Sequence, residues 1–351
     1  MNSNQQHIVN VNQEAREALR ALDALQDSVS RTLFVINNNN KLVGSVTDGD
    51  IRRGLLTGLE ISHPIASFMN TEFKYLKEAD DNLSRIKKYR EADIHVLPLI
   101  DNDFHLVEIL DLKKRRTLLP VAALIMAGGR GERLRPLTDV QPKPMLKIGD
   151  KPIIEHNIDR LISYGIKDIF ISVKYLKEQI MNFLGDGSAK GINITYIEET
   201  EPLGTLGAFS LIDKSTYEDI IVMNSDILTN IDFEDFYQYY KEHDASMALA
   251  SIPYQVNIPY AVLETIDYQV SSFKEKPSYI YYSNGGIYFM KFELNKLFDK
   301  GCFFNATVMM DLLIASAKQK LVHYPLLGYW LDIGKYDDLK KAQEDIKHVK
   351  I

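Results

Sequence analysis

The chain has 351 residues, which exceeds one typical domain and predicts two. Its apolar fraction of 45% and charged fraction of 25% are ordinary for globular proteins. A formal net charge of −7 argues against nucleic-acid binding, because phosphate backbones need clustered Lys and Arg. The single cysteine, Cys302, excludes an internal disulfide and a multi-cysteine zinc site. No apolar run approaches the ~20 residues of a membrane helix, and the N-terminus carries no apolar signal segment, so we expect a cytoplasmic protein without membrane contact.

The first third of the chain contains an internal repeat. Residues 34–43 and 98–107 share one pattern, in which two apolar runs flank a turn rich in Asn and Asp, and this pattern predicts a hairpin in each copy. Helical patterns flank both copies, at 14–25, 50–56, 81–92 and 111–116. The repeat therefore predicts a first, smaller α/β domain at 1–116.

This tandem arrangement resembles a pair of CBS motifs, a family of repeats that sense adenosine nucleotides. The first copy contains the spacing Gly-x-x-Thr47-x-x-Asp50. The resemblance implies that AMP, ADP or ATP binds there, with Thr47 on a phosphate and Asp50 accepting hydrogen bonds from ribose hydroxyls. The competing interpretation is that the carboxylate only favours the start of a helix. In the second copy, Glu108, Asp111 and Lys114 occupy the matching positions, which predicts a lost ribose site.

A short linker at 117–120 precedes a second domain at 121–351. Its first apolar run, 121–126, predicts a strand buried on both faces of a parallel sheet. The loop that follows reads Ala127-Gly128-Gly129-Arg130-Gly131-Glu132-Arg133-Leu134. Its glycines let backbone N–H groups approach a ligand, and its arginines favour a polyanion. The spacing excludes a Walker A loop and a dinucleotide fingerprint, since Leu134 stands where the latter needs a third glycine.

Strand and helix patterns then alternate along the chain, at 168–173, 175–184, 192–198, 204–212 and 219–223. This alternation predicts a doubly wound, mostly parallel α/β sheet, whose ligands lie at the carboxyl ends of the strands. Asp226 follows the last of these strands and should share a sheet edge with the glycine loop. Asp332, which lies between apolar residues, is a second candidate for a functional carboxylate, although on its own a structural role would be favoured for it.

Together the segments resemble the sugar-phosphate nucleotidylyltransferase family over residues 121–351. The resemblance lies in Ala127-Gly-Gly-x-Gly-x-Arg-Leu-x-Pro-Leu-Thr138 and in Pro142-Lys143-Pro144. It implies that Arg133 contacts the departing phosphates, that Lys143 contacts the reacting phosphates, and that Asp226 and Asp332 hold Mg²⁺. The metal offsets the repulsion between two polyanionic substrates. Ser225 departs from the family, which usually has Gly before the first Asp.

The same resemblance assigns residues to the substrate pockets. The nucleotide contacts are Ala127, Gly128, Gly129, Gly131, Glu199 and Gly204, with Leu206 in place of the usual Ala. The sugar contacts are Glu275, Lys276, Asn284 and Gly285, although Glu275-Lys276 alone would suit an exposed charge pair. The aromatic run 279–282 fits either a sugar pocket or a strand at a subunit interface.

The expected reaction joins a nucleotide from an NTP to a sugar-1-phosphate and releases pyrophosphate. The resemblance is closest to guanylyltransferases for mannose- or glucosamine-type phosphates, so GTP is favoured. Two alternatives remain open, namely a nucleotide sensor with a degenerate catalytic domain and a cytidylyltransferase for a non-sugar phosphate. Because twin CBS motifs often pair across subunits, we expect a homodimer or tetramer.

Overall fold

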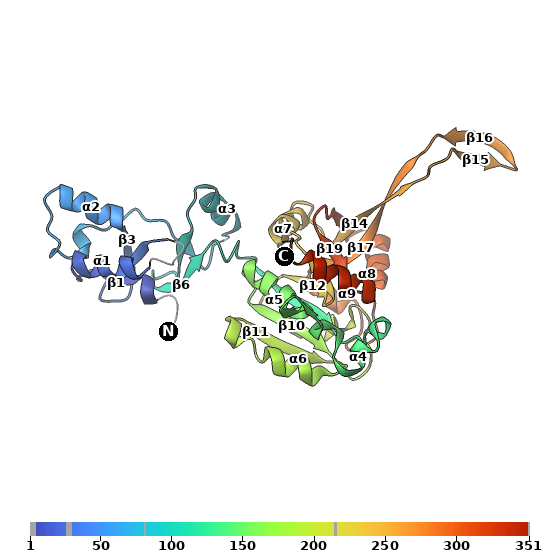
Figure 1. Cartoon of the computed structure of the whole chain (residues 1–351), viewed down its shortest axis with the longest axis horizontal. Coiled ribbons are helices and arrows are strands. Elements are labelled where there is room, and N and C mark those ends of the chain that lie inside the picture. The colour runs from blue at the N-terminus through green and yellow to red at the C-terminus, as the bar shows by residue number, and fades with distance from the viewer. Residues whose placement is uncertain (1–4, 26–29, 81, 214–215, 350–351) are drawn as a thin grey trace. The chain divides into compact units, whose positions relative to one another are not determined.

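The computed structural model describes residues 5–25, 30–80, 82–213 and 216–349. The chain divides into two compact units, Met1–Leu118 and Leu119–Ile351 (Figure 1). This division lies within the residues that the sequence assigns to the linker. Among the described residues, no helix is both long and apolar enough to cross a bilayer.

The first unit contains two similar three-stranded sheets. Their strands are β1 (Ile8–Asn10), β2 (Thr32–Ile36) and β3 (Leu42–Thr47), then β4 (Leu76–Lys77), β5 (Val96–Ile100) and β6 (Leu106–Asp111). In each sheet the first two strands pair in parallel and the last two form an antiparallel hairpin. The hairpins meet where Leu42 N donates to Phe104 O at 2.8 Å. The hairpins predicted from the repeat are therefore present in both copies.

Helices also flank the two sheets, but they repeat less regularly between the two copies than the strands do. They are α1 (Ala15–Ala24), α2 (Asp48–Leu56) and α3 (Leu83–Glu91), with 3-10 turns η1 (Gln5–His7) and η2 (Ile65–Ser67). The helix predicted at 81–92 is α3, and residue 81 lies outside the described residues. The prediction of a helix at 111–116 is wrong, because a turn follows β6 instead. Lys113 N donates to Asp111 Oδ1 at 2.9 Å in this turn, and such a side-chain bond to the backbone competes with a helix.

The second unit is built on a seven-stranded sheet in the order β11-β10-β7-β12-β17-β14-β18. The strands are β7 (Val121–Ala127), β10 (Asp168–Val173), β11 (Asn193–Glu198), β12 (Asp219–Asn224), β14 (Met247–Asn257), β17 (Ser278–Lys291) and β18 (Leu321–Pro325). Within this sheet only β17 runs against the other strands. The chain order reverses between β7 and β12, which is the switch point where such sheets bind ligands.

Helices cover both faces of this sheet. They are α5 (Ile153–Ser163), α6 (Lys177–Leu184), α7 (Phe233–Glu242), α8 (Ala306–Ala315) and α9 (Tyr336–Asp345), with a short α4 (Leu137–Val140). Met290 of β17 shares a buried cluster with Met309 of α8, whereas Phe289 contacts the ring of Phe236 from α7 at 4.9 Å. Because successive strand residues face opposite sides, α7 and α8 lie on opposite faces. The segment predicted as a helix at 204–212 forms a 3-10 helix, η6 (Gly207–Leu211).

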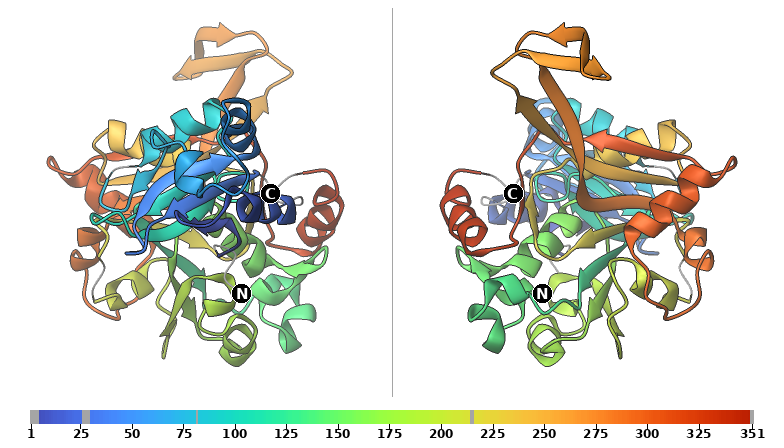
Figure 2. Two further views of the ribbon diagram at one scale, coloured as in Figure 1. Left: turned by 90° about the vertical axis from the view of Figure 1, so that its left-hand side faces the viewer. Right: turned by 90° about the vertical axis from the view of Figure 1, so that its right-hand side faces the viewer.

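Short elements complete the unit. They are β8 (Lys147–Ile148), β9 (Lys151–Pro152), β13 (Ile227–Thr229), β19 (Trp330–Asp332) and the 3-10 turns η3 (Glu132–Leu134), η4 (Lys143–Met145), η5 (Ser188–Lys190) and η7 (Phe292–Lys296). Between β14 and β17, a hairpin of β15 (Val262–Ile266) and β16 (Gln269–Lys274) stands at the end of a long two-stranded ribbon (Figure 1). We call residues 254–282 the arm, and both views of Figure 2 show it projecting away from the sheet.

Candidate active site

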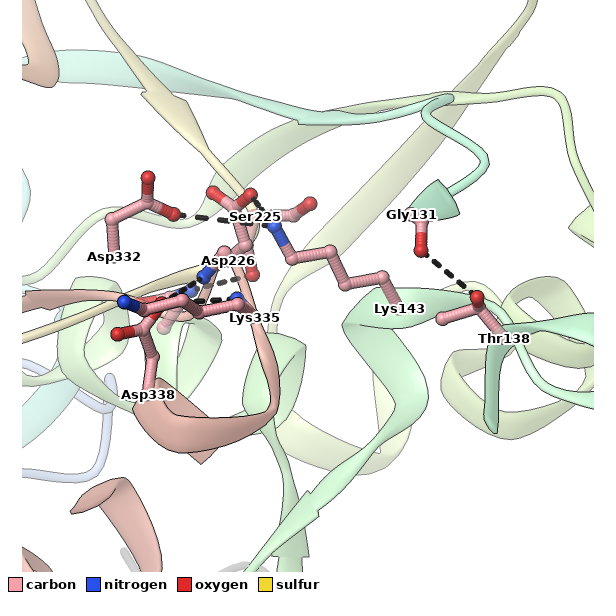
Figure 3. A network of polar contacts seen from close by, with 10 residues as sticks. Gly131, Thr138, Lys143, Ser225, Asp226, Asp332, Lys335 and Asp338 are labelled. Carbon is pink, nitrogen blue, oxygen red and sulfur yellow. Dashed lines mark hydrogen bonds and ion pairs between the residues drawn. The ribbon is translucent and has the colours of Figure 1, made fainter. Parts of the chain in front are cut away.

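The glycine-rich loop leaves β7 at the switch point of the sheet. Gly131 has a φ of +63°, and a Cβ there would lie 3.0 Å from side-chain carbons of both Lys143 and Thr138. Thr138 Oγ1 also donates to Gly131 O at 2.9 Å (Figure 3). Only glycine tolerates this combination of positive φ and close packing. The loop is therefore held directly against the segment that carries Lys143.

Lys143 is the basic group at the centre of the site. Its side chain is largely buried, and Nζ forms a hydrogen-bonded ion pair with Asp226 Oδ2. Nζ also lies 4.0 Å from Asp332 Oδ1 (Figure 3). A buried ammonium group is tolerated when carboxylates compensate its charge. Three residues predicted from separate motifs thus converge on one point.

Strand pairing explains how the two aspartates meet. Asp226 lies between β12 and β13, and Asp332 ends β19. In the antiparallel pair of β13 and β19, Ile227 lies opposite Asp332, and Ile333 N donates to Asp226 O at 3.0 Å. The short β13–β19 sheet therefore fixes the position of one carboxylate relative to the other.

Each of these aspartates keeps one unsatisfied oxygen. Asp226 Oδ1 and Asp332 Oδ1 are buried and accept no hydrogen bond from any residue in the described part of the chain. Burial, followed by repulsion from Asp226, raises the pKa of the Asp332 carboxyl, while Lys143 and Arg133 act in the opposite direction. Unsatisfied buried acceptors are destabilising and call for a partner. One or two carboxylates with free oxygens are what a protein offers Mg²⁺ when substrate phosphates supply the rest.

A cleft of about 850 Å³ opens at this edge of the sheet. Its volume lies within the range of sites for nucleotide-sized ligands. Eight of the predicted residues line it, namely Gly128, Gly129, Gly131, Arg133, Lys143, Glu199, Gly204 and Asp226. The guanidinium of Arg133 packs against Gly334, where a Cβ would lie 3.2 Å from it. The cleft therefore combines the glycine loop, four basic side chains (Arg130, Arg133, Lys143 and Lys174) and Asp226 of the aspartate pair.

A smaller hollow of about 360 Å³ has two lining residues in common with the cleft, Thr205 and Asn224. Asn284 and Gly285, both predicted to contact the sugar, line it together with Asp332. The carboxylate pair thus stands where the two hollows adjoin, with Asp226 on the larger and Asp332 on the smaller. This arrangement suits two ligands that react with each other between them.

Two of the predicted nucleotide contacts have roles within the chain itself. Glu199 accepts a hydrogen bond from Leu203 N at 3.1 Å, and a Cβ on Gly128 would lie 3.0 Å from its Oε1. Gly204 has a φ of +77°, and a Cβ there would lie 2.7 Å from Asn305 Oδ1. Glu199 therefore helps to position the glycine loop, and Gly204 permits close approach of another segment of the chain.

The structure places both departures from the family motifs and accounts for the first. Leu206 is fully buried in the core cluster that contains α8, so its larger side chain fills the core. Ser225 is buried beside the cleft, and its N–H donates to Met126 O at 3.2 Å. This backbone bond ties the segment before Asp226 to β7, and since glycine would form it equally well, nothing in the structure explains the serine itself.

Glu275 and Lys276 lie elsewhere. Both are exposed in the arm, between β16 and β17, and neither lines the cleft or the smaller hollow. The part of β17 from Ser278 to Asn284 alone spans ~20 Å at about 3.3 Å per residue. The structure therefore does not bring this charge pair to Asn284 and Gly285, and its sugar contacts stay a prediction.

In the first unit, Thr47 and Asp50 form a capping box at the start of α2. Thr47 N and Oγ1 donate to Asp50 Oδ2 at 2.8 and 2.7 Å, and Arg53 pairs with Oδ1. The helix-start interpretation therefore explains both side chains without a ligand. At the matching positions of the second copy, Glu108 pairs with Arg115 at 2.7 Å.

Sequence reasoning missed several residues of the cleft. Lys174 and Tyr175 follow β10 directly and line the cleft, and the Tyr175 ring lies 5.6 Å from the Arg130 guanidinium. Asn224, the last residue of β12, lines both hollows. All three are polar residues at the carboxyl ends of predicted parallel strands, and that position is the signal that could have found them.

Family comparisons agree with this geometry. The family model described as nucleotidyl transferase matches residues 122–349, and the CBS domain model matches residues 5–57. The chain belongs to the nucleotidyl transferase family. The family expected from the glycine loop and the Pro-Lys-Pro motif is thereby confirmed, as is a CBS domain in the first unit.

Individual relatives carry related names. The chain is 32% identical over 224 residues to a mannose-1-phosphate guanyltransferase of Yarrowia lipolytica, covering 61% of each chain. It is 33% identical over 234 residues to a D-glycero-alpha-D-manno-heptose 1-phosphate guanylyltransferase of Aneurinibacillus thermoaerophilus, covering 64% of this chain and 98% of that one. The match thus spans about three fifths of the mannose-1-phosphate guanylyltransferases and nearly all of the heptose enzyme.

A solved structure confirms the α/β fold class. The crystal structure of a putative glucose-1-phosphate thymidylyltransferase from Bacillus anthracis matches with a TM-score of 0.54. The match covers 66% of this chain and 97% of that one, at 22% sequence identity. At that identity the likeness speaks for the fold alone.

Proposed function

We propose that this chain transfers a nucleotidyl group from an NTP to a sugar-1-phosphate and releases pyrophosphate. The observation that carries the proposal is the convergence of Lys143, Asp226 and Asp332 between two adjoining hollows. The larger hollow, with the glycine loop, suits the NTP, and the smaller one suits the sugar. Membership of the nucleotidyl transferase family supports the reaction class.

Asp226 and Asp332 are the residues that would hold Mg²⁺, because each has a buried oxygen without a hydrogen bond. When bound, Mg²⁺ offsets the negative charge of the phosphates and of the departing pyrophosphate. Lys143 supplies a positive charge to the reacting phosphates, and Arg133 supplies another along the cleft. A sugar phosphate is already ionised at neutral pH, so the chain needs no general base for its attack. Positioning and electrostatic stabilisation account for the catalysis.

GTP is the favoured nucleotide, and a mannose- or heptose-type phosphate is the favoured acceptor. The names of two relatives, a mannose-1-phosphate guanyltransferase and a heptose 1-phosphate guanylyltransferase, support this choice. The test is pyrophosphate release with Mg²⁺, crossing GTP, UTP, dTTP, CTP and ATP against a panel of sugar-1-phosphates. We expect release with GTP and one such sugar phosphate. Pyrophosphate release only with CTP and a non-sugar phosphate would favour the cytidylyltransferase. No release by the folded protein with any pair would favour the degenerate sensor.

We further propose that the first unit binds an adenosine nucleotide at Thr47 and Asp50. The match to the CBS domain over residues 5–57 supports this proposal. Since Asp50 pairs with Arg53 and Thr47, a ribose would have to displace one of these contacts. Equilibrium dialysis with AMP tests it: we expect binding by the full chain and at least ~10-fold weaker binding by Asp50→Asn. Equal binding by both proteins would contradict the assignment.

A further inference from the structure

The arm exposes many apolar side chains within one short segment of the second unit. Beyond Ser251, β14 pairs only with β17, and β15 and β16 pair only with each other among the described strands. Every residue of β16 is exposed. Ten large apolar side chains of the arm are at least half exposed, namely Tyr254, Tyr260, Leu263, Ile266, Tyr268, Val270, Phe273, Ile280, Tyr281 and Tyr282.

The hairpin at the end of the arm has one apolar and one polar face. Leu263 lies opposite Phe273, and Thr265 opposite Val270, so these side chains share a face. The other face carries Glu264 opposite Ser272, with Lys274 at 3.0 Å from the Glu264 carboxylate. We call the surface of Leu263, Val270 and Phe273 the hairpin apolar face. In the described structure, no second layer of side chains packs against this face.

The ribbon that carries the hairpin repeats this pattern. Tyr254 lies opposite Tyr281 and Val256 opposite Tyr279, which places four apolar side chains on one face. The rings of Tyr279 and Tyr281 lie 6.4 Å apart between centroids. Tyr254 and Tyr281 remain 64% and 58% exposed. The apolar character therefore extends along the arm beyond its tip.

Such a surface requires a cover. An isolated two-stranded hairpin is at best marginally stable in water. The side chains that share the apolar face, Leu263, Val270 and Phe273 in the hairpin and Tyr254, Val256, Tyr279 and Tyr281 in the ribbon, together present on the order of 600 Å² of surface, since a buried aromatic alone contributes about 150–250 Å². The largest apolar patch of a typical monomer is about 300–600 Å². The apolar face of the arm therefore lies at the upper end of that range, and an apolar patch of this size often marks an interaction site.

We propose that the arm packs against the arm of a second copy of this chain, face to face, through the hairpin and ribbon apolar faces. The charge of the arm favours a second copy of the chain over a membrane as its partner, because residues 254–282 contain three acidic and two basic side chains. Anionic lipid surfaces attract polybasic segments instead. Pro253 precedes the arm and Pro277 lies within it, and both lack the backbone N–H that an edge strand would donate, which favours face packing over edge-to-edge pairing. A two-fold axis would let each apolar face cover its equivalent.

The test is the mass of the full chain in solution by light scattering at about 50 µM. We expect the wild type to show at least twice the 40.1 kDa of one chain. The variant Leu263→Ser/Phe273→Ser should halve the mass of the assembly. The matched control Ile266→Ser/Tyr268→Ser removes two apolar groups that are more exposed and lie outside the hairpin apolar face, and it should keep the wild-type mass. Circular dichroism checks that both variants fold, which we expect because the altered side chains are exposed.

A deletion tests the arm independently of single side chains. Asn257 and Ser278 lie opposite each other in the ribbon, so Asn-Gly can replace residues 258–277 as a two-residue turn. We expect this variant, too, to have half the wild-type mass. A monomeric wild type, an assembly that survives both the double substitution and the deletion, or a control that dissociates as readily would each overturn the proposal. A monomeric wild type that sediments with phosphatidylcholine vesicles would assign the surface to lipid instead.

Discussion

Lys143 and Asp226 form the closest charged contact of the site, and both were predictable from the sequence. Each stands in a short motif with an unambiguous spacing: one between two prolines, the other directly after a buried strand. The unsatisfied oxygens of Asp226 and Asp332 were not predictable, because they depend on how β13 pairs with β19. Likewise, the local roles of Glu199 and Gly204 follow from contacts between segments that are distant in the chain.

Lys143→Ala should lower turnover by at least ~100-fold, because it removes the buried positive charge beside Asp226 and Asp332 that we propose to act on the reacting phosphates. Lys147→Ala is the matched control, since Lys147 is exposed four residues away and lines neither hollow. Initial rates of pyrophosphate release measure both variants, with circular dichroism as a check on folding. Near-normal turnover of Lys143→Ala would remove Lys143 from the catalytic machinery.

Asp332→Asn should lose activity and gain thermal stability at neutral pH. The pKa of Asp332 is raised by burial and by Asp226, so its ionised form is the unfavourable one in the folded state. Between the ordinary carboxyl pKa and this raised pKa, the folded state binds more protons than the unfolded state, and stability falls as the pH rises. The stabilisation by Asn should therefore be larger at pH 7 than at pH 5 and disappear below pH ~4, the ordinary carboxyl pKa. Thermal unfolding of both proteins at these pH values measures the difference. If Asp332→Asn destabilises the fold at pH 7 instead, the inference that the ionised carboxylate is unfavourable in the folded state is wrong.

At the scale of elements, periodicity predicted the strands of the second unit better than the helices of the first. Val121–Ala127 and Asp219–Asn224 are continuous apolar runs and form neighbouring parallel strands. The segment 111–116 carries a helical pattern, yet the side chain of Asp111 caps a turn there. The local pattern at 111–116 does not distinguish a helix from a turn, because a short polar side chain competes with the helix for the same backbone N–H groups.

The arm shows a second limit of local patterns. The aromatic run 279–282 fitted either a sugar pocket or a subunit interface, and the structure places it on an exposed ribbon outside both hollows. The length of β14 and β17 decides this, since both strands continue well past the edge of the sheet. Strand length beyond a sheet cannot be read from composition, whereas the apolar alternation within the arm can.

The capping box of α2 makes a separate prediction for the first unit. Thr47→Ala removes the side-chain acceptor of Asp50 N and should destabilise the start of α2 by about 1 kcal/mol. Hydrogen exchange of residues 48–56 by mass spectrometry should become roughly 5-fold faster as a result. Exposed Thr71→Ala serves as the control and should leave this exchange unchanged. Unaltered exchange in Thr47→Ala would mean that the cap contributes nothing to the helix.

At the scale of the whole molecule, the two units of the chain were predicted from different features of the sequence. The repeat predicted the first unit, and its two matching three-stranded sheets follow from that repeat. Family motifs predicted the second unit, and its strand order places the glycine loop and Asp226 on adjacent strands at the switch point. The position of Glu275 and Lys276 was not foreseen, because the motif specifies residue types and leaves the course of the arm open.

We propose that this chain makes a nucleotide sugar at the Lys143, Asp226 and Asp332 cluster. The most direct measurement is mass-spectrometric detection of the product from GTP and mannose-1-phosphate or a heptose-1-phosphate with Mg²⁺, comparing the wild type with Asp226→Asn. We predict GDP-sugar and an equal amount of pyrophosphate from the wild type, and at least ~100-fold less of both from the variant. Equal product from both proteins would contradict the site. No nucleotide sugar from the folded wild type, with any NTP and sugar-1-phosphate of the wider panel, would contradict the proposed reaction itself.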